Sequence, residues 1–171
     1  MHEKKGAPMH KAEIYQFLKK RRIWHEITEH NAVFNMTELR NVEVPYSEAD
    51  AKNLFVRDDK KRGYFMITIM GDKRVKLKEF EKAHGLRHLS FASPDDMKKY
   101  LDVAPGSVSP FGLLNDAECK VKWFYDADFA KSRKQIIGIH PNDNTATTWL
   151  KIKDLVKIIS DHGSEVEEVE L

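Results

Sequence analysis

Between Leu89 and Asp116 the chain reads LSFASPDDMKKYLDVAPGSVSPFGLLND. The first part predicts a helix that begins after Ser93, because an N-cap serine, a proline and two acidic residues together favour a helix start. The second part contains Gly106-Ser107-Val108-Ser109-Pro110, in which prolines fix φ and Gly106 allows backbone angles closed to other residues. This segment predicts a rigid loop with outward backbone N–H groups, which suits an electron-rich oxygen better than a hydrophobic core.

Helices and strands interleave irregularly on both sides of this loop. Apolar spacing predicts helices over 11–21, 78–84 and 152–162, and strands over 23–27, 53–57, 64–70, 119–125, 136–139 and 166–169. The charged turn over 58–63 makes the second and third of these strands a hairpin. We also expect a short capped helix at Thr37, an extension of the sheet over 75–77, and a lead into the last helix over 146–150. Hairpins in place of repeated βαβ units predict an α+β fold with a mixed sheet.

Length and composition favour a single domain over 11–171, preceded by a flexible N-terminal tail over 1–10. The chain has 171 residues, of which 41% are hydrophobic, and its net charge of +2 is too small for a bulk nucleic-acid binder. The single cysteine, Cys119, excludes an internal disulfide and a cysteine-rich zinc site, and its spacing predicts a buried position on a strand face. No apolar stretch reaches membrane-spanning length and no signal-peptide core follows Met1, so we expect a soluble, cytoplasmic protein.

Three segments of the chain together resemble a known family. They are KNLFVRD at 52–58, the stretch at 89–116 quoted above, and HPNDNTATTW at 140–149. These motifs resemble the YbaK/prolyl-tRNA synthetase editing superfamily, and more closely its alanyl-tRNA(Pro) deacylases of the ProX type, from about Lys11 to the C-terminus. The resemblance implies a compact mixed sheet, partly curled like a barrel and surrounded by helices. It also implies hydrolysis, in trans, of alanine wrongly attached to proline tRNA, without a metal or organic cofactor.

The implied chemistry is attack of water on an aminoacyl ester, so hydrogen-bond donors must surround the developing oxyanion. The backbone N–H groups of Gly106, Ser107 and Val108 are the candidates; the alternative is an ordinary rigid connection. Lys52 matches the family's lysine and would hold the terminal phosphate or carbonyl region, unless it is a surface lysine. A serine nucleophile is disfavoured because no Gly-x-Ser-x-Gly elbow is present.

His140 matches the histidine of the family's H-P motif and would form a polar wall of the amino-acid pocket; a general base or a purely structural histidine are the alternatives. Asn53 could orient the substrate's amino group or the water, or it could equally hold a turn. Further substrate-binding candidates are Ser109, Pro110, His30 and Phe34. The pair His84 and His88 is spaced four apart, but Gly85 interrupts the helix between them and no third metal ligand is evident.

Basic clusters are the candidates for contact with the tRNA acceptor end. The two selected clusters consist of Lys19, Lys20, Arg21 and Arg22, and of Lys60, Lys61 and Arg62. A solvated charged surface is the alternative for each, and the sequence does not show that they share a face.

Prolyl-tRNA synthetase is a possible partner of the deacylase. Three other functions stay open: deacylation of cysteine or serine from tRNA, a non-catalytic tRNA-binding or regulatory homologue, and an editing domain that is part of a larger synthetase.

Overall fold

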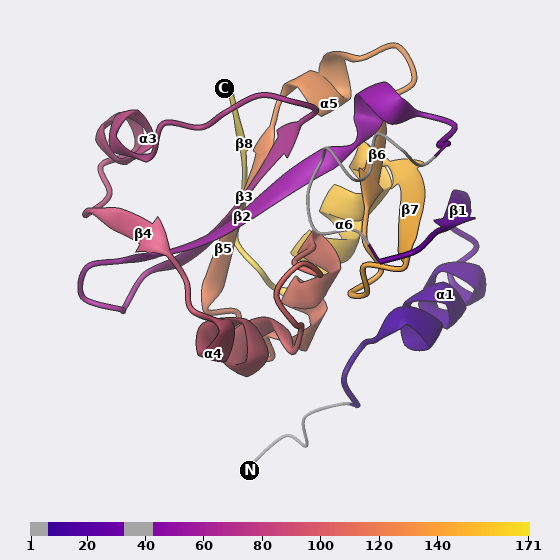
Figure 1. The fold of residues 1–171 in the computed structure, drawn as a ribbon, viewed down its shortest axis with the longest axis horizontal. Coiled ribbons are helices and arrows are strands. Elements are labelled where there is room, and N and C mark those ends of the chain that lie inside the picture. The colour runs from indigo at the N-terminus through magenta and orange to yellow at the C-terminus, as the bar shows by residue number, and fades with distance from the viewer. Residues whose placement is uncertain (1–6, 33–42) are drawn as a thin grey trace.

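Two β-sheets with helices packed on them form the structure, a computed structural model that describes residues 7–32 and 43–171 (Figure 1). The elements are α1 (Lys11–Lys20), β1 (His25–Glu29), η1 (Ser47–Ala49), β2 (Ala51–Asp58), β3 (Tyr64–Met70), α3 (Leu77–His84), β4 (Leu89–Phe91), α4 (Pro94–Asp96), η2 (Met97–Leu101), η3 (Pro110–Asn115), β5 (Val121–Asp126), α5 (Asp128–Lys131), β6 (Ile136–Ile139), β7 (Ala146–Lys151), α6 (Ile152–His162) and β8 (Val166–Val169).

One sheet is antiparallel with strand order β1-β7-β6, and the other is mixed with order β4-β2-β3-β5-β8. A parallel backbone bridge between Asp50 and Gly138 connects them, just before β2 and within β6. The prediction of an α+β fold with mixed strand directions is therefore confirmed. The resemblance implied a partly barrel-like sheet, but the strands form two separate sheets that do not close into a barrel.

The hairpin of β2 and β3 is confirmed, with Lys52 opposite Ile69 and Asn53 opposite Thr68. Two other predictions about the strands were wrong. Residues 75–77 do not extend the sheet: Val75 and Lys76 are irregular, Leu77 begins α3, and the apolar side chains of Val75 and Leu77 pack against the cluster that contains Phe80. Residues 146–150 form most of β7, the middle strand of the three-stranded sheet, where β-branched Thr147 and Thr148 fit an extended backbone.

Cys119 was also misplaced by its apparent alternation with the following apolar residues. It lies in the turn before β5 with a φ of +53° and is only half-buried. Its thiol contacts the carbonyl oxygen of His162 at 3.8 Å. The strand begins two residues later, at Val121.

The predicted helix after Ser93 is confirmed as α4 and η2, which together run from Pro94 to Leu101. Ser93 Oγ accepts a hydrogen bond from the Asp96 N–H, and Asp96 Oδ2 accepts one from the Ser93 N–H, which completes a capping box. Arg57 at the far end of β2 also contacts Asp96. The helix is thereby held against the hairpin.

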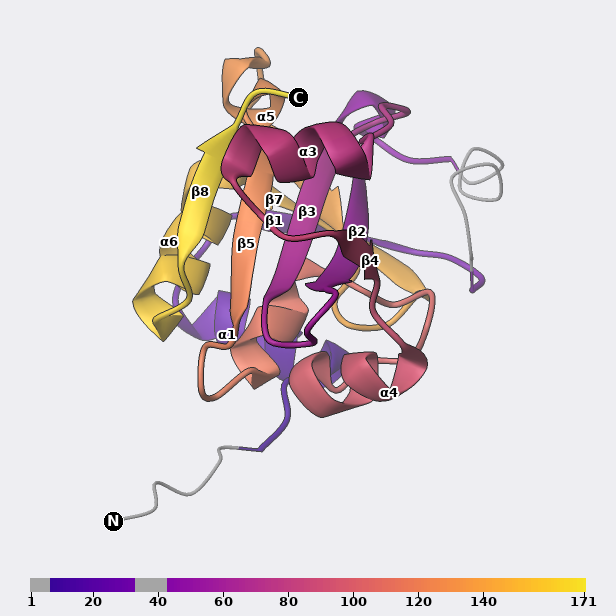
Figure 2. The same ribbon diagram turned by 90° about the vertical axis from the view of Figure 1, so that its left-hand side faces the viewer.

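The main core is formed by apolar side chains of both sheets and of the helices packed against them. Its fully buried members include Trp123 of β5, Phe111 of η3 and Leu150 of β7, with Ile14 of α1 and Ile159 of α6 packed among them. Helix α3 covers the opposite face of the five-stranded sheet and buries Phe80 there (Figure 2). None of the helices in the described ranges is long and apolar enough to cross a membrane.

Part of the segment predicted as a tail is anchored. The N–H of Met9 donates to Asn115 Oδ1 at 2.6 Å, and its carbonyl accepts from the side-chain amides of Asn115 (3.2 Å) and Asn142 (2.7 Å). Residues 1–6 lie outside the described chain. The packed part of the protein therefore begins before Lys11.

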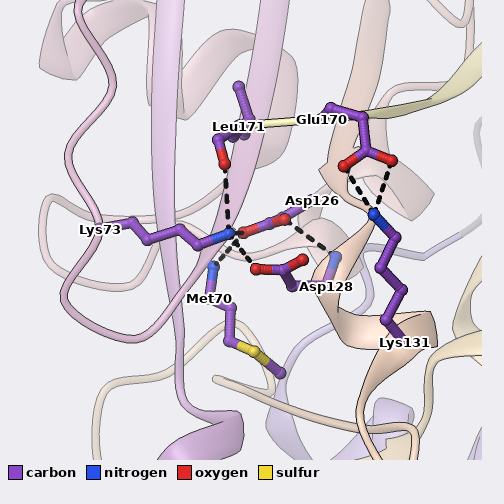
Figure 3. A network of polar contacts seen from close by, with 7 residues as sticks. All are labelled: Met70, Lys73, Asp126, Asp128, Lys131, Glu170 and Leu171. Carbon is purple, nitrogen blue, oxygen red and sulfur yellow. Dashed lines mark hydrogen bonds and ion pairs between the residues drawn. The ribbon is translucent and has the colours of Figure 1, made fainter.

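Two lysines fasten the C-terminal end of the chain beside β5 (Figure 3). Lys73 donates to Asp126 Oδ2 at 2.8 Å and to the carbonyl of Leu171 at 3.4 Å, and it also contacts Asp128. Lys131 donates to both carboxylate oxygens of Glu170 at 2.7 Å. These contacts tie the end of β8 to the turn after β3 and to α5.

Candidate functional site

The start of β2 places Lys52 beside the junction of the two sheets. Successive side chains of a strand alternate between its faces, so Lys52 lies on the same face as Asp50. A parallel bridge brings paired residues to one face, which places Gly138, and His140 two residues later, on that face as well. The Lys52 side chain is half-buried, and its ammonium group has no hydrogen-bond or ion-pair partner among the described residues. This cation is available to a ligand.

Asn53 points to the opposite face of β2, toward the main core. Its Oδ1 accepts a hydrogen bond from the Thr68 hydroxyl at 2.6 Å, and Thr68 Oγ1 accepts one from the Trp123 indole at 2.8 Å. Thr68 and Trp123 are fully buried. Of the two roles left open for Asn53, this network supports the structural one.

The structure brings His30 and His140 together at one end of the three-stranded sheet. Their ring centroids lie 6.1 Å apart with the rings in an edge-on arrangement. His30 Nε2 lies 3.0 Å from Thr147 Oγ1, and its Nδ1 lies 2.8 Å from the Asn31 carbonyl. Both histidines thus lie at the end of the sheet where β1 ends and β7 begins.

The contacts of His140 define its protonation. Its Nδ1 lies 2.8 Å from the Ala146 carbonyl, which can only accept, so Nδ1 carries the proton and Nε2 of the neutral ring is an acceptor. Burial lowers the pKa of His140 below its ordinary value, and the neighbouring His30 also lowers it. The Ala146 carbonyl and Asp143 act in the opposite direction. The net effect favours a neutral imidazole with a free acceptor nitrogen.

The Gly106–Pro110 loop presents fewer donors than predicted. Gly106 has a φ of +90°, a region that favours glycine, and the N–H of Ser107 donates to the Ala104 carbonyl at 3.0 Å. The N–H groups of Gly106 and Val108 have no hydrogen-bond partner in the described chain. These two groups, without Ser107, are therefore the candidate oxyanion donors.

Ser109 and Pro110 start the η3 helix rather than present free polar groups. Ser109 is fully buried, and its hydroxyl accepts a hydrogen bond from the Phe111 N–H at 3.2 Å. Its carbonyl accepts one from the Gly112 N–H at 2.8 Å. Pro110 is also buried, as the first residue of η3. Both residues therefore support the loop structurally and do not present free polar groups to a ligand.

The third motif contacts the second through Asn142. A Cβ atom on Gly112 would lie 3.6 Å from Asn142 Oδ1, so the turn after His140 packs directly on η3. Asn142 and Asn115 both donate to the carbonyl of Met9, which locks the two segments onto the same peptide unit. None of these three residues was predicted for the site. Asn115 and Asn142 lie within the quoted motifs, whereas Met9 lies outside them.

The remaining predicted residues lie in different places. Phe34 and the predicted helix at Thr37 lie outside the described residues. Lys19–Arg22 lie at the end of α1, directly before β1. Lys60–Arg62 form the hairpin turn at the opposite end of β2 from Lys52, about 20 Å away for six residues of strand. The hairpin turn and the candidate site are thus well separated.

Two cavities lie away from the candidate residues. A cavity of about 470 Å³ lies between Ala7–Met9 and η2, and a second of about 220 Å³ lies beside Tyr46 and Lys134. Neither is lined by Lys52, His140 or the Gly106–Pro110 loop. Within residues 7–32 and 43–171, no group of three or more His, Cys, Asp or Glu side chains could hold a metal ion.

Known proteins share sequence similarity with this chain over most of its length. The aminoacyl-tRNA editing domain family matches residues 30–158. The prolyl-tRNA editing protein ProX of Acetoanaerobium sticklandii is 35% identical over 150 residues, covering 88% of this chain and 90% of the relative. The prolyl-tRNA synthetase associated domain-containing protein 1 of Bos taurus is 30% identical over 162 residues, or 94% of each chain.

A solved structure supports the fold. It is described as "a putative trans-editing enzyme for prolyl tRNA synthetase", and it superposes with a TM-score of 0.65 at 18% identity. The superposition covers 94% of this chain and 97% of the other.

Proposed function

Because the chain belongs to the aminoacyl-tRNA editing domain family, we propose that it is a deacylase that hydrolyses mischarged alanyl-tRNA(Pro) in trans. The observation that carries the proposal is that two contacts link the three motifs in space. The Asp50–Gly138 bridge joins the strand of Lys52 to the strand that leads into His140, and Asn142 packs on the segment that follows the Gly106–Pro110 loop.

In the proposed reaction, water adds to the carbonyl carbon of the aminoacyl ester. The N–H groups of Gly106 and Val108 stabilise the developing oxyanion, and fixed backbone donors need no reorganisation to do so. His140 Nε2 accepts a hydrogen bond from the attacking water and orients it. The bond between the carbonyl carbon and the ribose oxygen then breaks, and the proton from water ends on that oxygen. The products are a free amino acid and a tRNA with a free terminal hydroxyl.

Lys52 would contribute a positive charge near the terminal phosphate of the tRNA. A half-buried ammonium group without an internal partner gains more from an anion than a fully solvated one, because screening by water is weaker. This role explains why a lysine lies at the start of a strand whose neighbouring residues face packed surfaces. It predicts that Lys52 acts on binding and positioning rather than on proton transfer.

Selection of alanine would follow from size. A synthetase pocket built for proline admits the smaller alanine, and a second pocket too small for proline can hydrolyse the error. Cysteine and serine are the competing substrates, because both are close to alanine in volume. Prolyl-tRNA synthetase is the partner that would supply the mischarged tRNA, and the proposed location is the cytoplasm.

The test is single-turnover hydrolysis of alanyl-tRNA(Pro), with prolyl-, seryl- and cysteinyl-tRNA as competing substrates. We expect fast loss of alanine, no loss of proline, and a rate lower by roughly 10²-fold in Lys52→Ala, because the ester is then less well positioned. Lys82→Ala, on the exposed face of α3, is the matched control and should keep the wild-type rate. Thermal unfolding checks that both variants fold. If wild-type protein left every one of these esters intact, the deacylase proposal would be wrong.

A further inference from the structure

The outer face of the three-stranded sheet carries three rows of side chains between Trp24 and His140. The β1–β7 and β6–β7 registers, extended by one residue, align Trp24 with Lys151 and Ile136, then Glu26 with Trp149 and Gly138, then Thr28 with Thr147 and His140. Two side-chain contacts confirm that these residues share a face. The Trp149 indole donates to Thr28 Oγ1 at 3.0 Å, and a Cβ atom on Gly138 would lie 2.3 Å from the Trp149 ring.

Cations and aromatic rings alternate at the end of this face that is remote from His140. Trp24 is 44% exposed, and the Lys151 ammonium lies 5.7 Å from its ring centroid. The same ammonium donates to the Lys134 carbonyl at 2.6 Å, and the Lys134 ammonium lies 5.0 Å from the ring centroid of Tyr46. We call Trp24, Lys151, Lys134 and Tyr46 the aromatic–basic track.

The track carries a net positive charge. Neither Lys134 nor Lys151 pairs with a carboxylate among the described residues, and the exposed Arg133 lines the 220 Å³ cavity beside Tyr46 together with Lys134. The acidic neighbours are Glu48, which also lines that cavity, and Glu26, which accepts a hydrogen bond from the Tyr46 hydroxyl at 2.9 Å. The basic end of α1, Lys19–Arg22, ends two residues before Trp24 in the chain.

We propose that the aromatic–basic track binds the single-stranded 3′ end of an RNA, the nucleotides just before the aminoacylated ribose. Aromatic side chains stack on bases of any sequence, and interleaved cations neutralise the phosphates between them. The inference rests on the proposed function. If the aminoacyl ester is hydrolysed beside His140, the track would hold the RNA strand that carries this ester. Residues 151 and 147 of β7 are four positions apart, so the track ends about 13 Å from the row of His140.

The placement of the track separates it from other basic clusters. Lys60–Arg62 lie at the far end of the β2–β3 hairpin, and α3 lies at the opposite side of the molecule from β1 and β7 (Figure 1). The track shares a sheet face with His140, whereas Lys60–Arg62 and the lysines of α3 belong to other parts of the fold. On that face, the row of Glu26, Trp149 and Gly138 lies between the track and the row of His140.

Trp24 provides a direct readout. The chain has three tryptophans, and Trp123 and Trp149 are fully buried, so a base that stacks on the protein surface quenches Trp24 alone. The probe is a short single-stranded RNA with the 3′-terminal sequence of tRNA(Pro) and a free hydroxyl. We expect quenching of the wild type, and about a tenfold loss of affinity in Trp24→Ala by anisotropy of labelled RNA. Trp24→Phe should keep the affinity and lose the fluorescence change.

The lysines are tested by salt dependence. The double variant Lys134→Gln/Lys151→Gln should bind more weakly and lower the slope of log affinity against log salt by about 1.4, for two phosphate contacts on a single strand. The matched control is Lys78→Gln/Lys82→Gln on exposed positions of α3, and it should leave slope and affinity unchanged. Equal affinity of wild type and the track variants, or an equal loss in the control, would overturn the proposal. So would binding of duplex RNA through these residues without binding of the single strand.

Failure of the proposed function gives a different pattern. The RNA probe carries no ester, so its binding is measured independently of hydrolysis. A wild type that binds the probe through Trp24 but hydrolyses no aminoacyl-tRNA supports the track and refutes the deacylase. A wild type that hydrolyses alanyl-tRNA(Pro) at a rate unaffected by Trp24→Ala, at subsaturating tRNA, refutes the track and supports the deacylase.

Discussion

The backbone of Asp50 pairs with that of Gly138, and this parallel bridge joins the strand of Lys52 to the strand that leads into His140. The Asp50 side chain is 5% exposed, and its Oδ1 has no hydrogen-bond partner in the described structure. A buried carboxyl group without a partner is costly when ionised. The junction of the two sheets therefore contains a carboxyl group whose ionisation opposes folding.

Asp50→Asn should change the pH dependence of stability. Burial, with a smaller effect of Glu48, raises the pKa of Asp50 to about 7, whereas an unfolded aspartate titrates near 4. As pH rises between these values, the unfolded chain loses the proton and the folded chain keeps it, so the free energy of unfolding falls. The variant lacks this loss, and its stability relative to wild type should rise across the window by at most about 4 kcal/mol. Urea unfolding from pH 4 to 8 measures the difference, and a constant difference would contradict the assignment.

Gly138→Ala should destabilise the protein because the new Cβ would lie 2.3 Å from the Trp149 ring. Overpacking of this kind costs about 1–3 kcal/mol. The three clashing atoms belong to the six-membered ring of Trp149, so Trp149→Leu should relieve the clash. We expect the double variant to be more stable than the sum of the single effects predicts, in a double-mutant cycle by urea unfolding. Strict additivity would mean that the two residues do not constrain each other.

His140 should keep the enzyme active at lower pH than an ordinary histidine would allow. Its pKa is lowered, mainly by burial, so the neutral ring with a free Nε2 persists below the usual titration range near 6.5. In a pH profile of single-turnover hydrolysis, the rate should fall only below that range, as the ring becomes protonated. His140→Gln keeps a hydrogen-bonding side chain that does not titrate, so its profile should be lower and flat in this range. An unchanged acid limb in His140→Gln would exclude His140 as its origin.

Lys73→Ala should destabilise the C-terminal end of the chain much more than Lys131→Ala. The Asp126 side chain is 1% exposed, and removal of Lys73 leaves that carboxylate with only the N–H groups of Met70 and Asp128. The expected cost is about 1–3 kcal/mol. Lys131 pairs with Glu170 in open solvent, where ion pairs contribute little, so its loss should hardly shift the urea midpoint. Equal effects of the two substitutions would show that burial of Asp126 does not matter.

Local signals in the sequence predicted the elements whose structure is set locally. The charged turn over 58–63 predicted the hairpin, and the capping residues at Ser93 predicted the start of α4. The strand β7 was missed because its Asn- and Thr-rich beginning resembles a turn. It is the middle strand of its sheet, and its extended form depends on pairing both with the nearby β6 and with β1, which lies more than 100 residues earlier in the sequence.

The motifs indicated the candidate site, but the arrangement within it depends on tertiary contacts. The network of Thr68 and Trp123 places Asn53 on the core face, although it is adjacent to Lys52 in the sequence. The use of the Ser107 N–H within its own turn was likewise not visible in the motif. Asp50 carried no sequence signal, because its burial results from a bridge to a residue 88 positions later.

The hydrogen bonds that Asn115 and Asn142 make to Met9 have a consequence for the order in which the protein folds during synthesis. Its partners Asn115 and Asn142 are 106 and 133 positions further along the chain. Contacts of such separation form late, because a long loop must close before they contribute. On the ribosome, the hairpin of β2 and β3 can form early, whereas the second and third motifs are locked together only after Asn142 has left the exit tunnel. A nascent chain therefore carries Lys52 in place long before it has a complete site.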